Sequence, residues 1–259
     1  MRTFSRPGRY GMATFKDHFS GAARGYAEHR PSYPPELFAW LATLPARREL
    51  AWDCATGNGQ AAVGLVPHFD RVVASDASAA QIVNRRVHPD ISYFVGLAEA
   101  SGLRDGCCDL VTVAQSVHWF DFERFYAEVR RVARPGAVVA VWTYTRFRVD
   151  PAVDAMVEPF YSQVVGPYWP PERKYVDAHY RTIPFPFEEI PAPATELTTE
   201  WSFSQLLRYL GTWSAVQNFK KQRRSDPIAD LAPVLEICWG PDDMVRTVKW
   251  PVHVRVGRV

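Results

Sequence analysis

The sequence predicts an α/β protein built on a doubly wound, mostly parallel β-sheet. Between residues 49 and 143, short apolar segments alternate with helical segments, which is typical of right-handed crossovers between parallel strands. The strand segments are apolar throughout, as expected for strands that helices cover on both faces. Residues 51–60 read as a strand ending in an acid, a turn of small residues, and a helix that begins at Gln60.

The individual elements follow from apolar runs and the residues that interrupt them. We expect helices at 15–26, 36–44, 60–66, 78–86 and 121–133, and strands at 49–54, 71–75, 91–95, 108–114 and 136–143. After about residue 150 the alternation stops, and a proline-rich stretch separates helical segments near 151–164 and 203–219. Residues 245–259 alternate well enough for a terminal strand, in which Pro251 marks a bulge or an edge.

Composition narrows the classes of partner. The chain has 259 residues, 47% of them hydrophobic and 22% charged, which is ordinary for one large globular domain. Its net charge of +2 argues against a nucleic-acid partner, and the basic run at 220–224 is typical of a solvated helix end. Neither a membrane-spanning run nor a secretory leader is evident, so we expect a cytoplasmic protein without a membrane partner.

The cysteines agree with a cytoplasmic location. The four cysteines match no zinc-binding spacing, so we expect reduced thiols and no metal site. Residues 1–14 are expected to form a disordered extension outside the fold.

The turn at Gly57 and Gly59 indicates a nucleoside-containing cofactor. Glycines allow the backbone to turn sharply and to approach a ligand closely, next to the N-terminus of a helix. Asp76 follows the next strand, where a carboxylate can accept hydrogen bonds from ribose hydroxyls. Gly57-x-Gly59-x-x-Ala62 also satisfies the relaxed dinucleotide pattern, but Asp53 would repel a pyrophosphate.

Several motifs together resemble class I S-adenosylmethionine-dependent methyltransferases. Asp53, Ala55, Gly57 and Gly59 match the family's acid-x-Gly-x-Gly-x-Gly pattern, with alanine in place of the first glycine. Three further segments extend the match over about residues 15–145, and resemble the branch of small-molecule methyltransferases similar to trans-aconitate methyltransferase. They are Ala98-Glu99, residues 114–121 and residues 130–142.

The resemblance implies a Rossmann-like sheet of seven strands. Residues 15–149 would form the S-adenosylmethionine-binding domain, and residues 150–242 a C-terminal cap over the site. A strand near 186–190 would pair antiparallel with the terminal strand in 243–259 and complete the sheet.

Ligands of open α/β sheets lie beyond the carboxyl ends of the strands, which gathers the candidate residues at one edge. The resemblance implies that the cofactor contacts Tyr26, Arg30, Asp53, Thr56, Gly57, Asn58, Gly59, Gln60, Asp76, Ala77, Ser78, Gln81, Ala98, Glu99, Gln115 and Ser116. The acceptor is expected beside Tyr33, His118, Trp119 and Tyr144. Asp76 has a simpler alternative role as the N-cap of the helix that begins near Ser78.

The expected reaction is methylation of a carboxylate on a small organic acid, which yields S-adenosylhomocysteine. A carboxylate acceptor needs no base, whereas a hydroxyl acceptor benefits from one. His118 is the candidate base, and its alternative role is structural, with the ring packed on Trp119. The aromatics Tyr168, Trp169, Trp201, Phe203 and Trp213 are candidates for an acceptor pocket, although aromatics at this spacing are more often core.

The sequence is also compatible with three other functions. They are a hydroxyl methyltransferase with His118 as base, a non-catalytic cofactor-binding scaffold, and an NAD-dependent oxidoreductase. Methylation of nucleic-acid bases is disfavoured because Gln115-Ser-Val-His118 replaces the expected Asp/Asn-Pro-Pro-aromatic motif. The chain is expected to act as a monomer or a homodimer.

Overall fold

The computed structural model describes residues 31–241 and 243–259. The expectations for the extension at 1–14, the helix at 15–26, Tyr26 and Arg30 lie outside the described residues. Within the described ranges, no helix has both the length and the apolar character needed to cross a bilayer.

The core of the molecule is one mixed sheet with strand order β3-β2-β1-β4-β5-β8-β6, with β7 pairing β8 beside β6. The first five strands are parallel, and their order reverses between β1 and β4. Their bounds are β1 Leu50–Cys54, β2 Arg71–Asp76, β3 Ile91–Val95, β4 Cys108–Ala114 and β5 Ala133–Tyr144. Ligands of such sheets bind where the strand order reverses, so the end of β1 is the expected position of the site.

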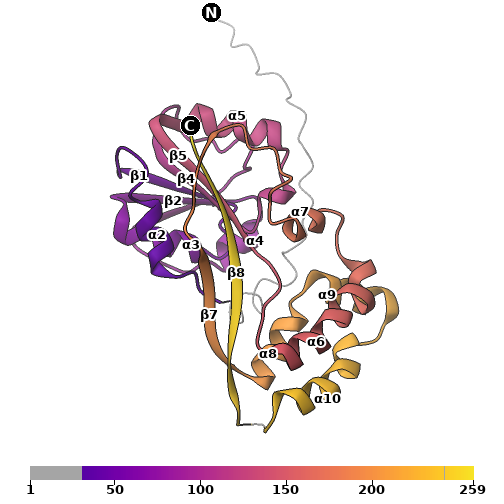
Figure 1. Cartoon of the computed structure of the whole chain (residues 1–259). Helices are drawn as coiled ribbons and strands as arrows, with labels where there is room; N and C mark the ends of the chain where they lie inside the picture. Colours follow the sequence, from indigo (N-terminus) through magenta and orange to yellow (C-terminus); the bar gives the residue numbers. More distant parts are fainter. Residues whose placement is uncertain (1–30, 242) are drawn as a thin grey trace, which may run out of the picture.

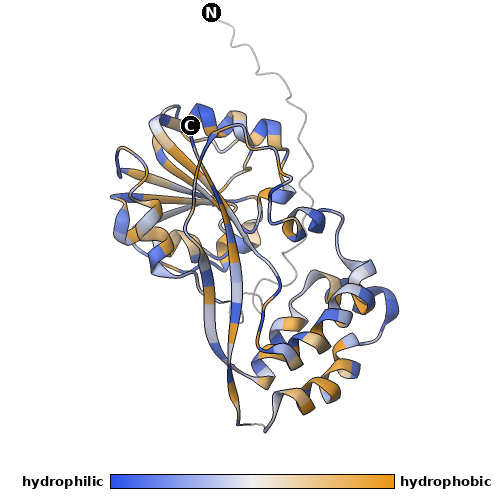
Figure 2. Cartoon of the chain, viewed as in Figure 1, coloured by the Kyte–Doolittle hydropathy of each residue, from blue (hydrophilic) through white to orange (hydrophobic). Residues whose placement is uncertain are grey.

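Helices cover both faces of the sheet (Figure 1). Side chains alternate along each strand: Ala51 and Leu110 face the layer formed by α2 and α3, whereas Trp52 and Val111 face α5. The bounds are α2 Pro35–Leu41, α3 Gln60–Leu65, η2 Val66–His68, α4 Ala79–Val83, η3 Val117–Trp119 and α5 Phe122–Val132. The central strands are accordingly hydrophobic, while α5 alternates in hydropathy around its circumference (Figure 2).

The sheet has eight strands, so the prediction of seven is wrong. The pairing of β6 (Glu188–Ile190) with β8 (Val245–Arg258) was expected, but β7 (Thr195–Ser202) was not. β5 covers only residues 252–258 of β8, and β7 pairs with residues 245–252. β6 and β7 therefore follow one another along the same side of β8, separated by a segment containing Pro191 and Pro193, which lack the N–H needed for a ladder.

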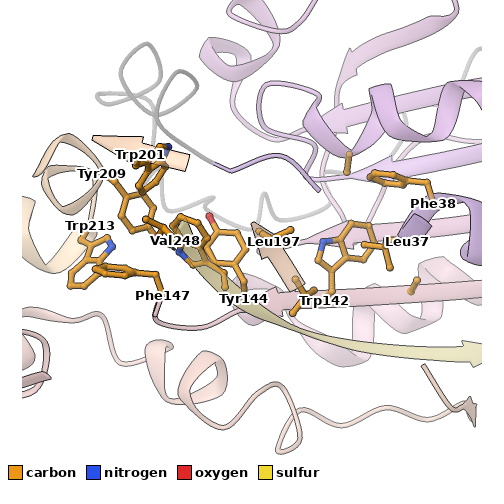
Figure 3. Close-up of a cluster of buried hydrophobic side chains, with 14 of the residues drawn as sticks. Leu37, Phe38, Trp142, Tyr144, Phe147, Leu197, Trp201, Tyr209, Trp213 and Val248 are labelled. Atoms are coloured by element: carbon orange, nitrogen blue, oxygen red, sulfur yellow. Dashed lines mark hydrogen bonds between the residues drawn. The ribbon is translucent and has the colours of Figure 1, made fainter. Parts of the chain in front are cut away.

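A helical cap lies at the far end of the β7–β8 ribbon (Figure 1). Its elements are α6 Pro151–Pro159, the π-helical turn η4 Phe160–Val164, η5 Gly166–Tyr168, α8 Phe203–Gly211, α9 Ser214–Arg223 and α10 Pro227–Trp239. The short helix α7 Arg173–Asp177 lies outside this group, next to the sheet, where it packs against η3 (Figure 1). The helical stretch expected near 203–219 consists of two helices, α8 and α9, because Trp213 adopts an extended conformation between them. The indole of Trp213 is buried against Phe147, Phe160 and Tyr209, and this packing ends α8 (Figure 3).

Candidate functional site

The turn after β1 is held in left-handed backbone conformations. Ala55, Gly57 and Gly59 have φ angles of 52°, 56° and 87°. The alanine that replaces the family's first glycine therefore adopts a conformation that costs an L-residue about 1 kcal/mol. Among the described residues, a Cβ at Gly57 would meet no atom within 4 Å, whereas a Cβ at Gly59 would lie 2.2 Å from the Tyr93 hydroxyl oxygen. Gly57 thus borders open space in the described part of the chain, whereas a side chain at Gly59 would force the Tyr93 ring to move.

The buried carboxylate of Asp53 holds this turn against the neighbouring strand by hydrogen bonds. Its carboxylate is fully buried and accepts hydrogen bonds from the hydroxyls of Thr56 (2.5 Å) and Thr112 (2.8 Å). Burial raises the pKa of Asp53 to about 6, because it opposes ionisation more strongly than the hydrogen bonds favour it. The carboxylate therefore joins the ends of β1 and β4 and places a titratable charge beneath the glycine turn.

Asp76 connects the ends of β1 and β2. One carboxylate oxygen accepts a hydrogen bond from the backbone N–H of Gly57 (2.9 Å), and the other accepts one from Ser78 (2.8 Å). The N-cap of α4 is Ser78, whose hydroxyl accepts from the buried Gln81, so the capping role considered for Asp76 belongs to Ser78. Ala77, half-buried, lies between them. Asp76 thus fixes the glycine turn against the second strand.

The glycine turn and the start of α3 are connected to the segment before α2 and to the segment after α4. Gln60, the first residue of α3, donates its side-chain amide to the carbonyl of Pro31 at 2.7 Å. The carbonyl of Asn58 accepts from the backbone N–H of Arg86 at 2.8 Å. The glycine turn is therefore held on both sides by neighbouring segments.

The loops after β3 and β4 are also joined to each other. Ala98 is buried, and the carboxylate of Glu99 accepts from the backbone N–H of Asp121 at 3.1 Å. Gln115 has a left-handed φ of 60°, and its side-chain oxygen accepts from the Thr143 hydroxyl at 2.8 Å. A non-glycine residue in this conformation is typical of functional turns. The hydroxyl of Ser116 donates to the backbone of β4.

His118 lies buried in η3 directly after β4. Its Nδ1 hydrogen-bonds the Tyr180 hydroxyl at 2.7 Å, and its ring centroid lies 4.7 Å from that of Trp119. Burial, together with the nearby positive charge of Arg173, lowers the pKa of His118 to about 3. An imidazole with such a low pKa is a weak base, because general bases work best with pKa values near the operating pH.

Tyr33 lies beside β5, and Tyr144 is the last residue of that strand. The Tyr33 ring meets Trp142 edge-on, with centroids 5.5 Å apart, and Tyr144 is buried at the end of the strand. In Figure 3, Trp142 and Tyr144 continue into the aromatic cluster of the cap. Trp201 and Trp213 are buried in this cluster and belong to the core, whereas Tyr168, Trp169 and Phe203 are half-buried against it.

Known proteins of similar sequence and structure identify the family of this chain. A family model described as "Methyltransferase domain" matches residues 52–141. A Dictyostelium discoideum protein named as a methyltransferase is 32% identical over 247 residues, which cover 93% of this chain and 94% of that protein. The chain belongs to the class I S-adenosylmethionine-dependent methyltransferases. A structure described as a type II methyltransferase from Anaeromyxobacter dehalogenans is 47% identical, with a TM-score of 0.84 over 88% of this chain and 97% of that one.

A more distant relative names the cofactor. A Saccharomyces cerevisiae protein named as an S-adenosylmethionine-dependent methyltransferase is 28% identical over 128 residues, covering 46% of this methyltransferase and 44% of the yeast protein. The family assignment decides between methyl transfer and the nicotinamide chemistry that the glycine pattern also allowed.

The carboxyl edge of the methyltransferase's sheet fits this cofactor. Among residues 31–241 and 243–259, the turn at Gly57 borders open space, and Asp53 and Asp76 lie at the carboxyl ends of the adjacent strands β1 and β2. When bound, S-adenosylmethionine supplies a methyl group on positively charged sulfur. Asp76 would accept hydrogen bonds from the ribose, and Ala98 and Glu99 would flank the adenine. The negative charge of Asp53 beneath the turn would attract the cationic methionine half.

Two residues beside His118 could not be predicted from the sequence. Tyr180 holds the ring of His118, and Arg173 lowers its pKa. Both come from α7 and the turn that follows it, a region for which no element was predicted. Their sequence distance from His118 exceeds any local pattern, so only the folded structure reveals the pairing.

Proposed function

We propose that this methyltransferase esterifies a carboxylate of a small organic acid, enclosed between the carboxyl edge of the sheet and the region from about 150 to 242. A carboxylate oxygen forms a bond to the methyl carbon while the carbon–sulfur bond breaks. The electron pair of that bond passes to sulfur, which becomes the neutral thioether of S-adenosylhomocysteine. No proton is transferred, so the reaction depends on proximity and alignment, which can contribute about 7–11 kcal/mol.

The observation that carries this proposal is that His118 is buried, has a low pKa and is hydrogen-bonded to Tyr180. It is the histidine that directly follows β4, where the acceptor is expected, and its pKa of about 3 makes it a poor base for a hydroxyl. Its Nδ1 is also engaged by Tyr180. These features support a positioning role, which agrees with an acceptor that is already ionised at neutral pH. The trans-aconitate-like branch stays a prediction from the sequence resemblance.

The test uses S-adenosylmethionine with a deuterated methyl group and a panel of small acids and phenols. Mass spectrometry should find the label in acids, and mild alkali should release it as methanol, because esters hydrolyse and aryl methyl ethers do not. Activity should stay flat from about pH 7 to 9, above the pKa of about 6 of Asp53, and His118→Gln should retain most of it.

Two results would contradict the proposal. One is an alkali-stable methyl ether as the main product. The other is a pH profile with a rising limb near 6.5 that disappears in His118→Gln, which would restore the hydroxyl acceptor with His118 as base.

A further inference from the structure

The turn that follows α7 is fixed beside the acceptor side of the site. The Tyr180 hydroxyl contacts His118, and the ring of His179 stacks on His253 with centroids 3.7 Å apart. Arg255 on β8 donates to the carbonyls of Tyr180 (2.9 Å) and Ile183 (2.7 Å). α7 is therefore held on a rigid support next to His118, and its first residue, Arg173, has a defined position.

Arg173 is held by hydrogen bonds from its Nε and by contacts of its guanidinium with aromatic rings. Its guanidinium carbon lies 4.3 Å from the ring centroid of Trp169 and 5.3 Å from that of Tyr161. Its Nε donates to the Tyr161 hydroxyl at 2.9 Å and to the Asp177 carboxylate at 3.1 Å. Its side chain is only 22% exposed. The rings and Asp177 thus fix the guanidinium plane.

The two terminal nitrogens of the same guanidinium, Nη1 and Nη2, are not engaged by these contacts. Neither Nη1 nor Nη2 has a hydrogen-bond partner within residues 31–241 and 243–259. These two nitrogens form the fork that pairs with a carboxylate in two parallel hydrogen bonds. Arg173 also lies close enough to His118 for its charge to act on the imidazole, and α7 packs against η3. A preorganised anion-binding edge therefore lies next to the expected position of the acceptor.

We infer that Arg173 binds an anionic group of the acceptor, and that this group is one that the reaction leaves unchanged. The inference rests on the proposed esterification. A guanidinium bound to the reacting carboxylate would stabilise the substrate more than the transition state, because the negative charge disappears as the ester forms. The acceptor class is therefore an acid with a second anionic group, such as a dicarboxylate, held at one end by Arg173.

The test compares glutarate with valerate, which has the same chain length and only one carboxylate. Calorimetry of the protein saturated with S-adenosylhomocysteine should show glutarate binding at least tenfold tighter than valerate. Arg173→Gln should remove that preference and raise KM for glutarate at least tenfold, while kcat and the affinity for S-adenosylhomocysteine change less than threefold.

Asp177→Asn is the matched control for a purely structural role. It removes the ion pair with Arg173, but the amide oxygen can still accept from the Tyr161 hydroxyl and from Arg173 Nε, so the guanidinium stays held and Nη1 and Nη2 are untouched. KM for glutarate should therefore rise by less than threefold. Equal KM changes in both variants, or an unchanged KM in Arg173→Gln, would overturn the role of Arg173. Arg173-dependent binding of glutarate without methylation of any acid would overturn the proposed esterification alone, and absence of both binding and methylation would overturn both.

Discussion

Replacing Asp53 with asparagine should stabilise the apo protein at alkaline pH. Burial raises the pKa of Asp53 from 3.8 to about 6, so the folded state resists ionisation of this carboxyl group. At about 1.4 kcal/mol per pKa unit, the ionised group costs up to about 3 kcal/mol of unfolding free energy above pH 6. Asparagine has nearly the same shape and can hydrogen-bond both Thr56 and Thr112 without carrying a charge.

The sign of the pH dependence distinguishes this mechanism from a general packing effect. Between pH 3.8 and about 6 the folded state binds more protons than the unfolded state, so the stability contributed by Asp53 is present at low pH and is lost as the pH rises. Urea denaturation should therefore show Asp53→Asn more stable than wild type at pH 8, with most of the difference gone near pH 4. A variant that is less stable at pH 8, or a difference that does not depend on pH, would refute the argument.

Glu128→Gln is a control of opposite sign. Burial raises the pKa of Glu128, but hydrogen bonds from Arg131 and Ser101 outweigh it and leave the pKa at about 2. The stability contributed by Glu128 is thus present above its ordinary pKa of 4.5 and is lost as the pH falls toward 2. Glu128→Gln should be less stable than wild type at pH 8, and the difference should narrow in acid.

The turn after β1 yields two further predictions. Ala55→Gly should raise the unfolding free energy by up to about 1 kcal/mol, because glycine adopts the left-handed conformation of Ala55 without steric cost; lower stability in urea denaturation would contradict this. Gly59→Ala should destabilise the apo protein more than Gly57→Ala does, because only the former forces a Cβ to within 2.2 Å of the Tyr93 hydroxyl. Equal midpoints for the two alanine variants in thermal denaturation would show that backbone conformation alone decides the cost.

Most of the parallel sheet could be predicted because its strands are apolar runs with clear ends. The predicted bounds of β3 and β4 match the structure, and those of β1 and β2 differ by one residue. β7 was missed because its inward positions, Leu197 and Trp201, alternate with threonines and glutamates and are separated from β6 by a proline segment. Its period of two is present in the sequence, but only two residues carry a strong apolar signal.

The cofactor side of the site was easier to predict than the acceptor side. The glycines, Asp53 and Asp76 follow strand ends, and strand ends in a parallel sheet meet at one edge. Arg173 begins a helix of only five residues, and Tyr180 lies in the turn after it, where two left-handed residues, His179 and Tyr180, follow without a glycine to mark the turn. Their approach to His118 depends on tertiary packing, which no local pattern encodes.

The most direct test of the account is the affinity of the protein for S-adenosylhomocysteine, measured by calorimetry in wild type, Asp76→Ala and Asp109→Ala. Both aspartates accept two backbone N–H groups, but Asp109 binds those of Glu49 and Leu50, at the amino end of β1 and away from the site. Both variants should therefore lose stability, by about 1–3 kcal/mol for Asp76→Ala and by more for Asp109→Ala, which also removes a partner of Arg134.

Only Asp76→Ala should lose affinity, by about 10- to 100-fold, the usual effect of removing hydrogen bonds to a charged group. Equal affinities in the two variants, or a wild-type protein that binds NAD but no S-adenosylhomocysteine, would contradict the placement of the cofactor at this edge of the sheet.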